Sequence, residues 1–210
     1  MKTLNKEMQD AITPLMALEL LKEGNKRFVN NLKFNRNLLA QANETSDGQH
    51  PMAVILSCID SRTSAELIFD QGLGDIFSVR IAGNIVNEDI LGSMEFACKI
   101  SGVKIILVLG HTNCGAVKGA GQHIEMGNLT GLLNKIRPSF DDETTVTENR
   151  NEKNSKFIDK VAVINVKRSI KEILERSTIL ERMLENNEIS IVGAIHDISN
   201  GIVTFFEDNK

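Results

Sequence analysis

The sequence predicts an α/β fold: a mostly parallel central sheet of four parallel strands and one antiparallel edge strand, flanked by helices. Short, uninterrupted apolar runs, typical of strands buried on both faces, alternate along the chain with segments of helical period. The 210 residues are 41% hydrophobic and 25% charged, which is ordinary for a soluble globular protein. We therefore expect a single domain over residues 1–210, in which residues 1–48 form an N-terminal helical arm.

The first half of the predicted fold contains a helix and two strands. A helix over 14–31 has Thr13 as a suitable N-cap, a proline in its first turn and apolar residues at helical spacing. A polar segment over 35–49 leads to the first strand, 52–56, which is a continuous apolar run. The second strand, 76–79, follows two glycines, as expected for a strand that begins after a turn.

The middle of the chain contains the strongest strand signal. A helix over 89–101 ends at a glycine, and the apolar run 103–109 then predicts the third strand. A second helix is expected to start near residue 115 and to continue toward residue 126. The segment 141–154 is polar and charged, so we expect a loop or a frayed connection there.

The C-terminal part supplies the last helices and strands. Apolar residues at helical spacing predict a helix over 157–176, and Ser177 or Thr178 can cap a further short helix. The runs 189–192 and 202–206 read as strands separated by an Asn-Gly pair, which is a strong hairpin signal. The last strand is therefore expected to lie antiparallel at the edge of the sheet.

Charge and cysteine content narrow the possible partners and the compartment. The net charge is −4, which argues against nucleic acid or an anionic membrane as a partner. No apolar stretch approaches the roughly 20 residues that span a bilayer, and charged residues interrupt the N-terminal segment. The chain has three cysteines, which a reducing compartment would keep as thiols. We therefore expect a cytoplasmic protein with no membrane partner.

Chemistry-bearing residues directly follow two of the predicted strands. Residues 58–62 come after the first strand and residues 110–115 after the third, and the carboxyl ends of neighbouring parallel strands meet at one edge of the sheet. Cys58, His111 and Cys114 are then expected to converge. Two thiolates and one imidazole suit Zn²⁺, and three protein ligands leave the fourth position open, as in catalytic zinc sites. We predict one zinc ion per subunit.

Two further residues, Asp60 and Arg62, would serve the same site. Their spacing from Cys58 places all three side chains on one side of an extended backbone. A carboxylate beside the metal can hold the bound water, while the arginine keeps that carboxylate ionised and oriented. Cys114 is expected at a helix N-terminus, where the helix dipole lowers the pKa of a thiol.

Each residue also has a plainer interpretation. A cysteine at a strand end is usually a small buried hydrophobe, a lone histidine can belong to the core, and a surface Asp–Arg pair contributes little. Cys98 is most simply a packing residue, and Arg80 and Asn84 are left outside the catalytic set. A zinc-binding or redox-sensing protein without catalytic activity is an alternative function. The Asp60–Arg62 pair favours an enzyme, because a sensor does not need it.

These motifs resemble those of the β-class carbonic anhydrases. Cys58-x-Asp60-x-Arg62 is followed, at the spacing typical of that family, by His111-x-x-Cys114-Gly. The similarity extends over most of the chain, including the segments Val79–Asn84 and Asn165–Ser169. It implies reversible hydration of CO₂ to bicarbonate and a proton through zinc-bound hydroxide, with Cys58, His111 and Cys114 as ligands and Asp60 and Arg62 as the dyad that orients the nucleophile. It also implies a homodimer or homotetramer whose N-terminal helices pack on a partner subunit.

The resemblance further implies a small apolar substrate pocket, built at the interface between two subunits. Its expected residues are Gln49, Phe77, Ala82, Phe96 and Gly115. The chain has nine Phe but neither Tyr nor Trp, so the bicarbonate-regulated form of the family, which uses both residues, is not expected here. We predict a zinc ion that keeps its open position at neutral pH. Hydrolysis of a related triatomic such as carbon disulfide remains an alternative reaction on the same scaffold.

Overall fold

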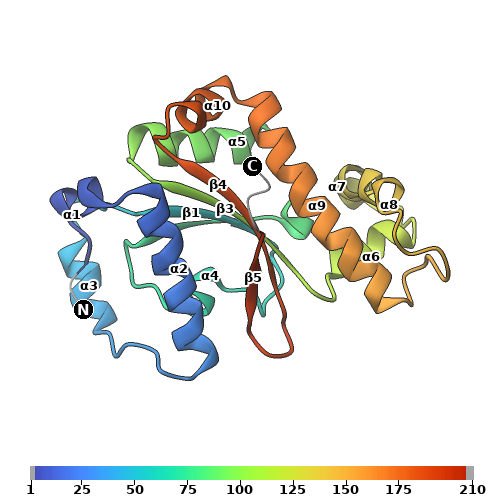
Figure 1. Cartoon of the computed structure of the whole chain (residues 1–210), viewed down its shortest axis with the longest axis horizontal. Helices are drawn as coiled ribbons and strands as arrows, with labels where there is room; N and C mark the ends of the chain where they lie inside the picture. The colour runs from blue at the N-terminus through green and yellow to red at the C-terminus, as the bar shows by residue number, and fades with distance from the viewer. Residues whose placement is uncertain (1–2, 207–210) are drawn as a thin grey trace.

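A five-stranded mixed sheet forms the centre of the computed structural model, which describes residues 3–206 (Figure 1). The strand order is β2-β1-β3-β4-β5; the first four strands are parallel, and β5 runs antiparallel to β4. Both the four parallel strands and the antiparallel edge strand are confirmed. The strands are β1 (Ala53–Ser57), β2 (Ile76–Arg80), β3 (Ile105–His111), β4 (Ser190–His196) and β5 (Val203–Phe205).

Helices connect the strands and cover both faces of the sheet. They are α1 (Lys6–Ala11), α2 (Pro14–Val29), α3 (Leu38–Glu44), α4 (Ala65–Ile68), the 3₁₀ turn η1 (Ala82–Asn84), α5 (Glu88–Glu95), the π-helical turn η2 (Phe96–Ile100), α6 (Gly115–Gly121), α7 (Gly127–Ile136), α8 (Pro138–Asp142), α9 (Ser155–Arg176) and α10 (Thr178–Glu185). The predicted helices over 14–31, 89–101 and 157–176 correspond to α2, to α5 with η2, and to α9. Thr13 caps α2 and Ser177 caps α10, as expected.

Several short helices lie where the sequence pattern predicted none. The predicted polar segment 35–49 contains α3, whose cap Asn37 accepts a hydrogen bond from the backbone N–H of Ala40. The helix predicted from residue 115 toward 126 ends at Gly121, and His123, at a φ of 53°, reverses the chain before α7. The predicted loop 141–154 begins inside α8. One or two helical turns are too short for periodicity to reveal them.

The core lies in two layers, one on each face of the sheet. Alternate residues of β1 face opposite layers, and all five are buried: Ile55 packs with α2 and α4, and Leu56 packs on the face covered by α5, α9 and α10. A third cluster of buried side chains lies beyond the carboxyl ends of β1 and β3, among α6, α7 and α9. The sheet is therefore a rigid support for residues that follow these two strand ends.

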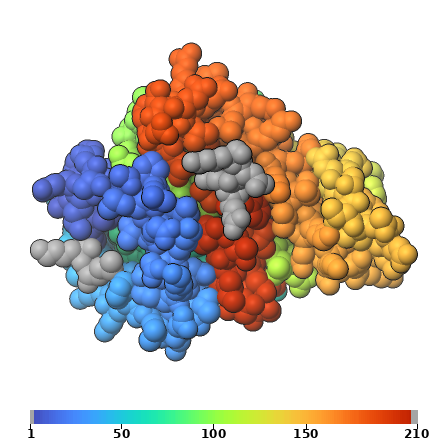
Figure 2. All heavy atoms as spheres, viewed as in Figure 1, coloured from blue at the N-terminus to red at the C-terminus, as the bar shows by residue number. Residues whose placement is uncertain are grey.

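The N-terminal helices pack on the sheet of their own chain. Gln9 of α1 donates from Nε2 to the carbonyls of Pro51 and Ser101, both at 2.8 Å. Asn25 of α2 donates to the carbonyl of Gly201 at 2.9 Å and accepts from the backbone N–H of Val203 at 2.9 Å. In Figure 2 these helices, in blue, lie at one end of the molecule and the α7–α8 region, in yellow, at the other. None of the described helices has the length and apolar character needed to cross a membrane.

Candidate metal centre

Cys58, His111 and Cys114 come together at the carboxyl edge of the sheet. Cys58 is the first residue after β1, His111 is the last residue of β3, and Cys114 precedes the first residue of α6. The neighbouring strands β1 and β3 pair with Ser57 opposite Leu109, which brings both strand ends to the same level. The two sulfur atoms and an imidazole nitrogen lie within 4.8 Å of one another, and all three residues are buried. The predicted convergence is confirmed.

The hydrogen bonding of His111 leaves one ring nitrogen available. Its Nδ1 lies 2.9 Å from the carbonyl oxygen of Thr112, an acceptor, so Nδ1 carries the proton. Nε2 is then the deprotonated nitrogen, and it is buried without a hydrogen-bond partner among residues 3–206. A buried nitrogen lone pair with no donor is costly unless a cation binds it.

The two thiols share their protons unequally. The hydrogen bond from Cys114 lowers the pKa of Cys58 well below its usual range, and the backbone N–H groups of Gly83 and Asp60 act in the same direction against burial. The same contact with Cys58, together with burial, raises the pKa of Cys114. The prediction that the helix N-terminus lowers the pKa of Cys114 is therefore wrong as a net effect, although the N–H groups of Ala116 and Val117 do act that way.

The donor set fits a zinc ion. Two sulfurs and one unprotonated imidazole nitrogen are the soft and borderline ligands that Zn²⁺ prefers, at bond lengths of about 2.3 Å and 2.0–2.1 Å. A divalent cation among them would allow both thiols to ionise, which the pair alone resists. The cluster offers three ligands, so a tetrahedral ion would keep one position for another molecule.

Asp60 and Arg62 form a close ion pair beside this cluster. The guanidinium donates from Nε to Oδ1 of Asp60 at 2.9 Å and from an Nη to Oδ2 at 2.7 Å. The backbone N–H of Arg62 adds a third bond, to Oδ1 at 3.0 Å. These bonds hold the pKa of Asp60 well below its usual range, so the carboxylate accepts hydrogen bonds only.

The backbone of this segment differs from the prediction. Residues 61–62 form a turn rather than extended strand, so the reasoning from strand alternation was wrong. The bond from the Arg62 N–H to the Asp60 side chain closes that turn, because aspartate readily bonds the backbone two residues on. The turn brings the two charged groups together, whereas Cys58 faces the other metal-ligating residues.

Arg80, which the sequence analysis places outside the catalytic set, contacts the backbone of the site. Its guanidinium donates to the carbonyl of Cys58 at 3.1 Å and to the carbonyl of Asp60 at 2.6 Å. The hydroxyl of Thr63 bonds the same two carbonyls, at 3.2 and 2.9 Å. Arg80 is the last residue of β2 and lies opposite Ser57 of β1. Its position at the end of the strand next to β1 was the sequence signal that could have placed it near Cys58. Together these donors fix the backbone that carries the ligand and the carboxylate.

The predicted pocket residues divide into two groups. Gly115 directly follows Cys114, and Ala82 directly precedes Gly83, whose N–H contacts the Cys58 sulfur at 3.3 Å. Gln49 instead precedes β1, at the opposite end of the strand from Cys58. Phe77 pairs with Val54, four residues before Cys58 and therefore roughly 13 Å away along the strand. A single chain does not bring all five together.

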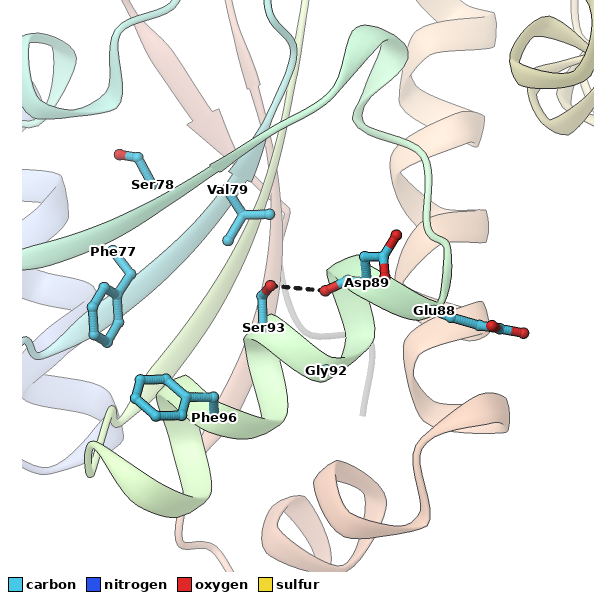
Figure 3. Close-up of a pocket in the computed structure, with 8 residues that line it drawn as sticks. All are labelled: Phe77, Ser78, Val79, Glu88, Asp89, Gly92, Ser93 and Phe96. Carbon is cyan, nitrogen blue, oxygen red and sulfur yellow. Dashed lines mark hydrogen bonds between the residues drawn. The ribbon is translucent and has the colours of Figure 1, made fainter. Parts of the chain in front are cut away.

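Phe77 and Phe96 meet in a separate groove between β2 and α5 (Figure 3). Their ring centroids are 6.4 Å apart, and the groove has a volume of about 640 Å³. The Ser93 hydroxyl on its α5 side donates to the carbonyl of Asp89 at 2.7 Å. Phe96 is 55% exposed, so this apolar groove lies open on the surface of the chain.

Comparison with known proteins agrees with this geometry. Residues 53–203 match the family model described as carbonic anhydrase. Carbonic anhydrase 2 of Mycobacterium tuberculosis is 35% identical over 194 residues, covering 90% of each chain, and the carbonic anhydrase of Mycolicibacterium smegmatis is 34% identical over 197 residues, covering 90% of this chain and 92% of that protein.

Solved structures show the same fold. The β-carbonic anhydrase CcaA superposes with a TM-score of 0.71 at 26% identity, covering 90% of this chain and 95% of the other. The β-carbonic anhydrase CafA of Aspergillus fumigatus gives a TM-score of 0.70 at 25% identity, with 92% and 90% covered. The matched family model includes both strand ends that carry the cysteine and histidine cluster. The chain therefore belongs to the β class of the carbonic anhydrase family.

Proposed function

We propose that this chain catalyses the reversible hydration of carbon dioxide to bicarbonate and a proton. The observation that carries the proposal is the buried cluster of Cys58, His111 and Cys114, in which Nε2 of His111 lacks a donor. Zinc bound there would act as a Lewis acid, lowering the pKa of water toward about 7 and so supplying a nucleophile at neutral pH.

The protein's own groups would orient the reactants. The carbonyl of Thr112 fixes the His111 ring through Nδ1, so that Nε2 points into the cluster. Asp60, ionised and held by Arg62, can accept a hydrogen bond from the reacting water and so direct its oxygen lone pair toward CO₂. Arg80 and Thr63 hold the Cys58–Asp60 backbone, so neither group has to reorganise during the reaction.

The arginine contacts also bear on whether the site stays open at neutral pH. Both carboxylate oxygens of Asp60 receive bonds from Arg62, so moving Asp60 onto the metal would break at least one charge-assisted bond. We infer an enzyme whose metal keeps its open position at neutral pH. A crystal structure of the zinc-loaded protein at pH 7 tests this inference, which fails if Asp60 is found as the fourth ligand.

A second copy of the chain would complete the substrate pocket. Gln49, Phe77 and Phe96 lie away from the metal ligands of their own chain, and we infer that they serve the partner's site. Exposed apolar side chains flank the edge strand β2 on both sides, with Phe96 55%, Ile100 72% and Leu67 58% exposed. A homodimer or homotetramer would bury this surface and bring it to the partner's Ala82 and the partner's Gly115.

The N-terminal helices would contribute to the same assembly. Their buried faces pack on their own sheet, yet Leu15 of α2 is 68% and Leu39 of α3 74% exposed, and Leu32 in the loop between these helices is 69% exposed. Such residues on adjacent elements favour contact with a partner subunit. We also infer that residues 1–210 act as one domain. We further infer that the protein works in a reducing, cytoplasmic compartment, because Cys58, Cys98 and Cys114 are free thiols.

Stopped-flow measurement of CO₂ hydration, with zinc content measured in parallel, tests the function. We expect one zinc per chain in the wild type, and loss of most zinc and activity in Cys58→Ser. Cys98→Ser is the matched control, because Cys98 is buried in the opposite part of the core and touches no ligand. Full activity in Cys58→Ser would refute the assignment.

The same assay separates the alternative functions. A sensor would bind zinc without hydrating CO₂, and a carbon disulfide hydrolase would turn over that substrate instead. We expect CO₂ hydration in the wild type, because the Asp60 carboxylate, held by Arg62, can accept a hydrogen bond from the reacting water and so orient it. Zinc binding with no CO₂ turnover would overturn the proposal.

A further inference from the structure

The turn η1 contacts the metal centre through a backbone group. The N–H of Gly83 donates to the sulfur of Cys58 at 3.3 Å, and both groups are buried. Gly83 and Asn84 both have left-handed backbones, with φ of 69° and 43°. A side chain at position 83 would be strained by this left-handed φ, and its Cβ would also lie 3.2 Å from Cβ of Ala116, so glycine is favoured there. Two consecutive left-handed residues persist only where the surrounding structure holds them.

Helix α9 supplies that support. Asn165 donates from Nδ2 to the carbonyl of Gly83 at 2.8 Å, and Ser169 donates from its hydroxyl to the carbonyl of Asn84 at 3.0 Å. The two side chains are four residues apart and lie on one helix face, and they are 3% and 4% exposed. The hydroxyl of Ser139 in turn bonds Oδ1 of Asn165 at 3.4 Å, which fixes the amide orientation.

We propose that Asn165 and Ser169 are positioning residues for the metal centre: from α9 they hold the Gly83–Asn84 turn so that the Gly83 N–H donates to the Cys58 sulfur. An N–H donor stabilises the negative charge of a ligating thiolate and fixes the direction of its lone pairs. Without Asn165, the buried carbonyl of Gly83 loses its partner, and the strained turn relaxes away from the sulfur. The inference rests on the proposed zinc site.

The first measurement is zinc affinity, by competition with a chromophoric chelator. Outer-shell partners of metal ligands typically contribute 10–100-fold in affinity, so we expect Asn165→Ala to bind zinc about 10–100-fold more weakly. Ser169→Ala should show a smaller loss, roughly a few-fold, because it holds the carbonyl one residue further from Gly83. Both variants keep all three ligands.

The second measurement reports on the sulfur itself. Cobalt(II) in the site gives a thiolate-to-metal charge-transfer band, whose energy changes when a thiolate loses a hydrogen bond. We expect this band to shift in Asn165→Ala. The matched control is Ile173→Val, fully buried on the same helix but packed against the other core layer. That substitution should lower the midpoint of thermal unfolding, but it should change neither the zinc affinity nor the energy of the charge-transfer band.

The outcomes are distinguishable. Wild-type protein that fails to bind zinc would refute the metal site itself, and with it this inference. Wild-type protein that binds zinc, with unchanged affinity and cobalt spectrum in Asn165→Ala, would refute only the positioning role. If Asn165→Ala does not fold, Ser169→Ala decides: weaker binding with a shifted band supports the role, and wild-type values overturn it.

Discussion

Gly24 in the middle of α2 gives a direct test of how the N-terminal helix is seated. A Cβ at this position would lie 1.8 Å from the carbonyl oxygen of Phe69 and 2.7 Å from its carbon. Those are backbone atoms at the end of α4, so they cannot rotate away. Since heavy-atom contacts become repulsive below about 3.5 Å, Gly24→Ala would force the two helices apart by roughly 1.7 Å.

The cost follows from what α2 buries. Ala17 and Leu21 on the same helix are 0% exposed against the sheet, and a shift of that size opens space around them. Opening a cavity around a buried leucine costs about 2.7–5 kcal/mol, and the better helix propensity of alanine returns about 1 kcal/mol. We expect a net loss of about 2–4 kcal/mol, which for a chain of this size lowers the midpoint of thermal unfolding by roughly 10 °C.

The matched control is the same substitution at Gly131, in the interior of α7. A Cβ there meets no atom within 4 Å, so Gly131→Ala should gain about 0.5–1 kcal/mol from helix propensity alone. Thermal unfolding followed by circular dichroism, with urea titration as a second measure, compares the variants. If Gly24→Ala matches or exceeds the wild type in stability, the reasoning about α2 is wrong.

Three further predictions concern the charged and thiol groups. Arg62→Met should raise the pKa of Asp60 toward its ordinary value. Because the native pKa is depressed, the pair stabilises the fold fully above about pH 4 and loses that contribution progressively as the pH falls further. The stability difference between wild type and variant, small for so exposed an arginine, should therefore be largest at neutral pH and shrink in urea titrations below pH 4, and a difference that grows toward acid pH would contradict this. Arg150→Ala removes the partner of buried Glu143, so limited proteolysis should cut residues 144–154 faster than in wild type, and an unchanged rate would contradict that role. Burial raises the pKa of the Cys98 thiol to about 12, so peptide mass spectrometry should find it unmodified after iodoacetamide treatment of the folded protein at pH 8; rapid labelling would show that the site opens.

Sequence pattern was sufficient to predict the sheet and the cluster of Cys58, His111 and Cys114. The apolar runs that form β1 and β3 are continuous, and both strands are fully buried, so the strand signal was unambiguous. Cys58 and His111 lie at or directly after those strand ends, where the geometry of parallel strands brings them together. Ligand type then identified the metal. Helices of one or two turns, such as α3, were not predicted, because they are stabilised by caps and tertiary packing rather than by a periodic sequence pattern.

The tertiary structure alone decided how the metal centre is held. The bond from Gly83 to Cys58 joins residues 25 apart in sequence, and the bond from Asn165 to Gly83 joins residues 82 apart. Such contacts depend on how α9 packs over the strand ends, which no local pattern encodes. The unequal thiols of Cys58 and Cys114 likewise arise from burial and mutual contact.

The pocket residues also show the difference between what the sequence predicts and what only the tertiary structure decides. By itself, the sequence predicted the fold class and the convergence of Cys58, His111 and Cys114, because strand order decides which residues reach one edge of the sheet. Only the tertiary structure placed Phe77 opposite Val54 and so away from that edge, since the register between two strands does not follow from residue type. The physical reason is that the type of each residue decides which ligand or proton its side chain can bind, whereas packing between distant segments of the chain decides where that side chain lies.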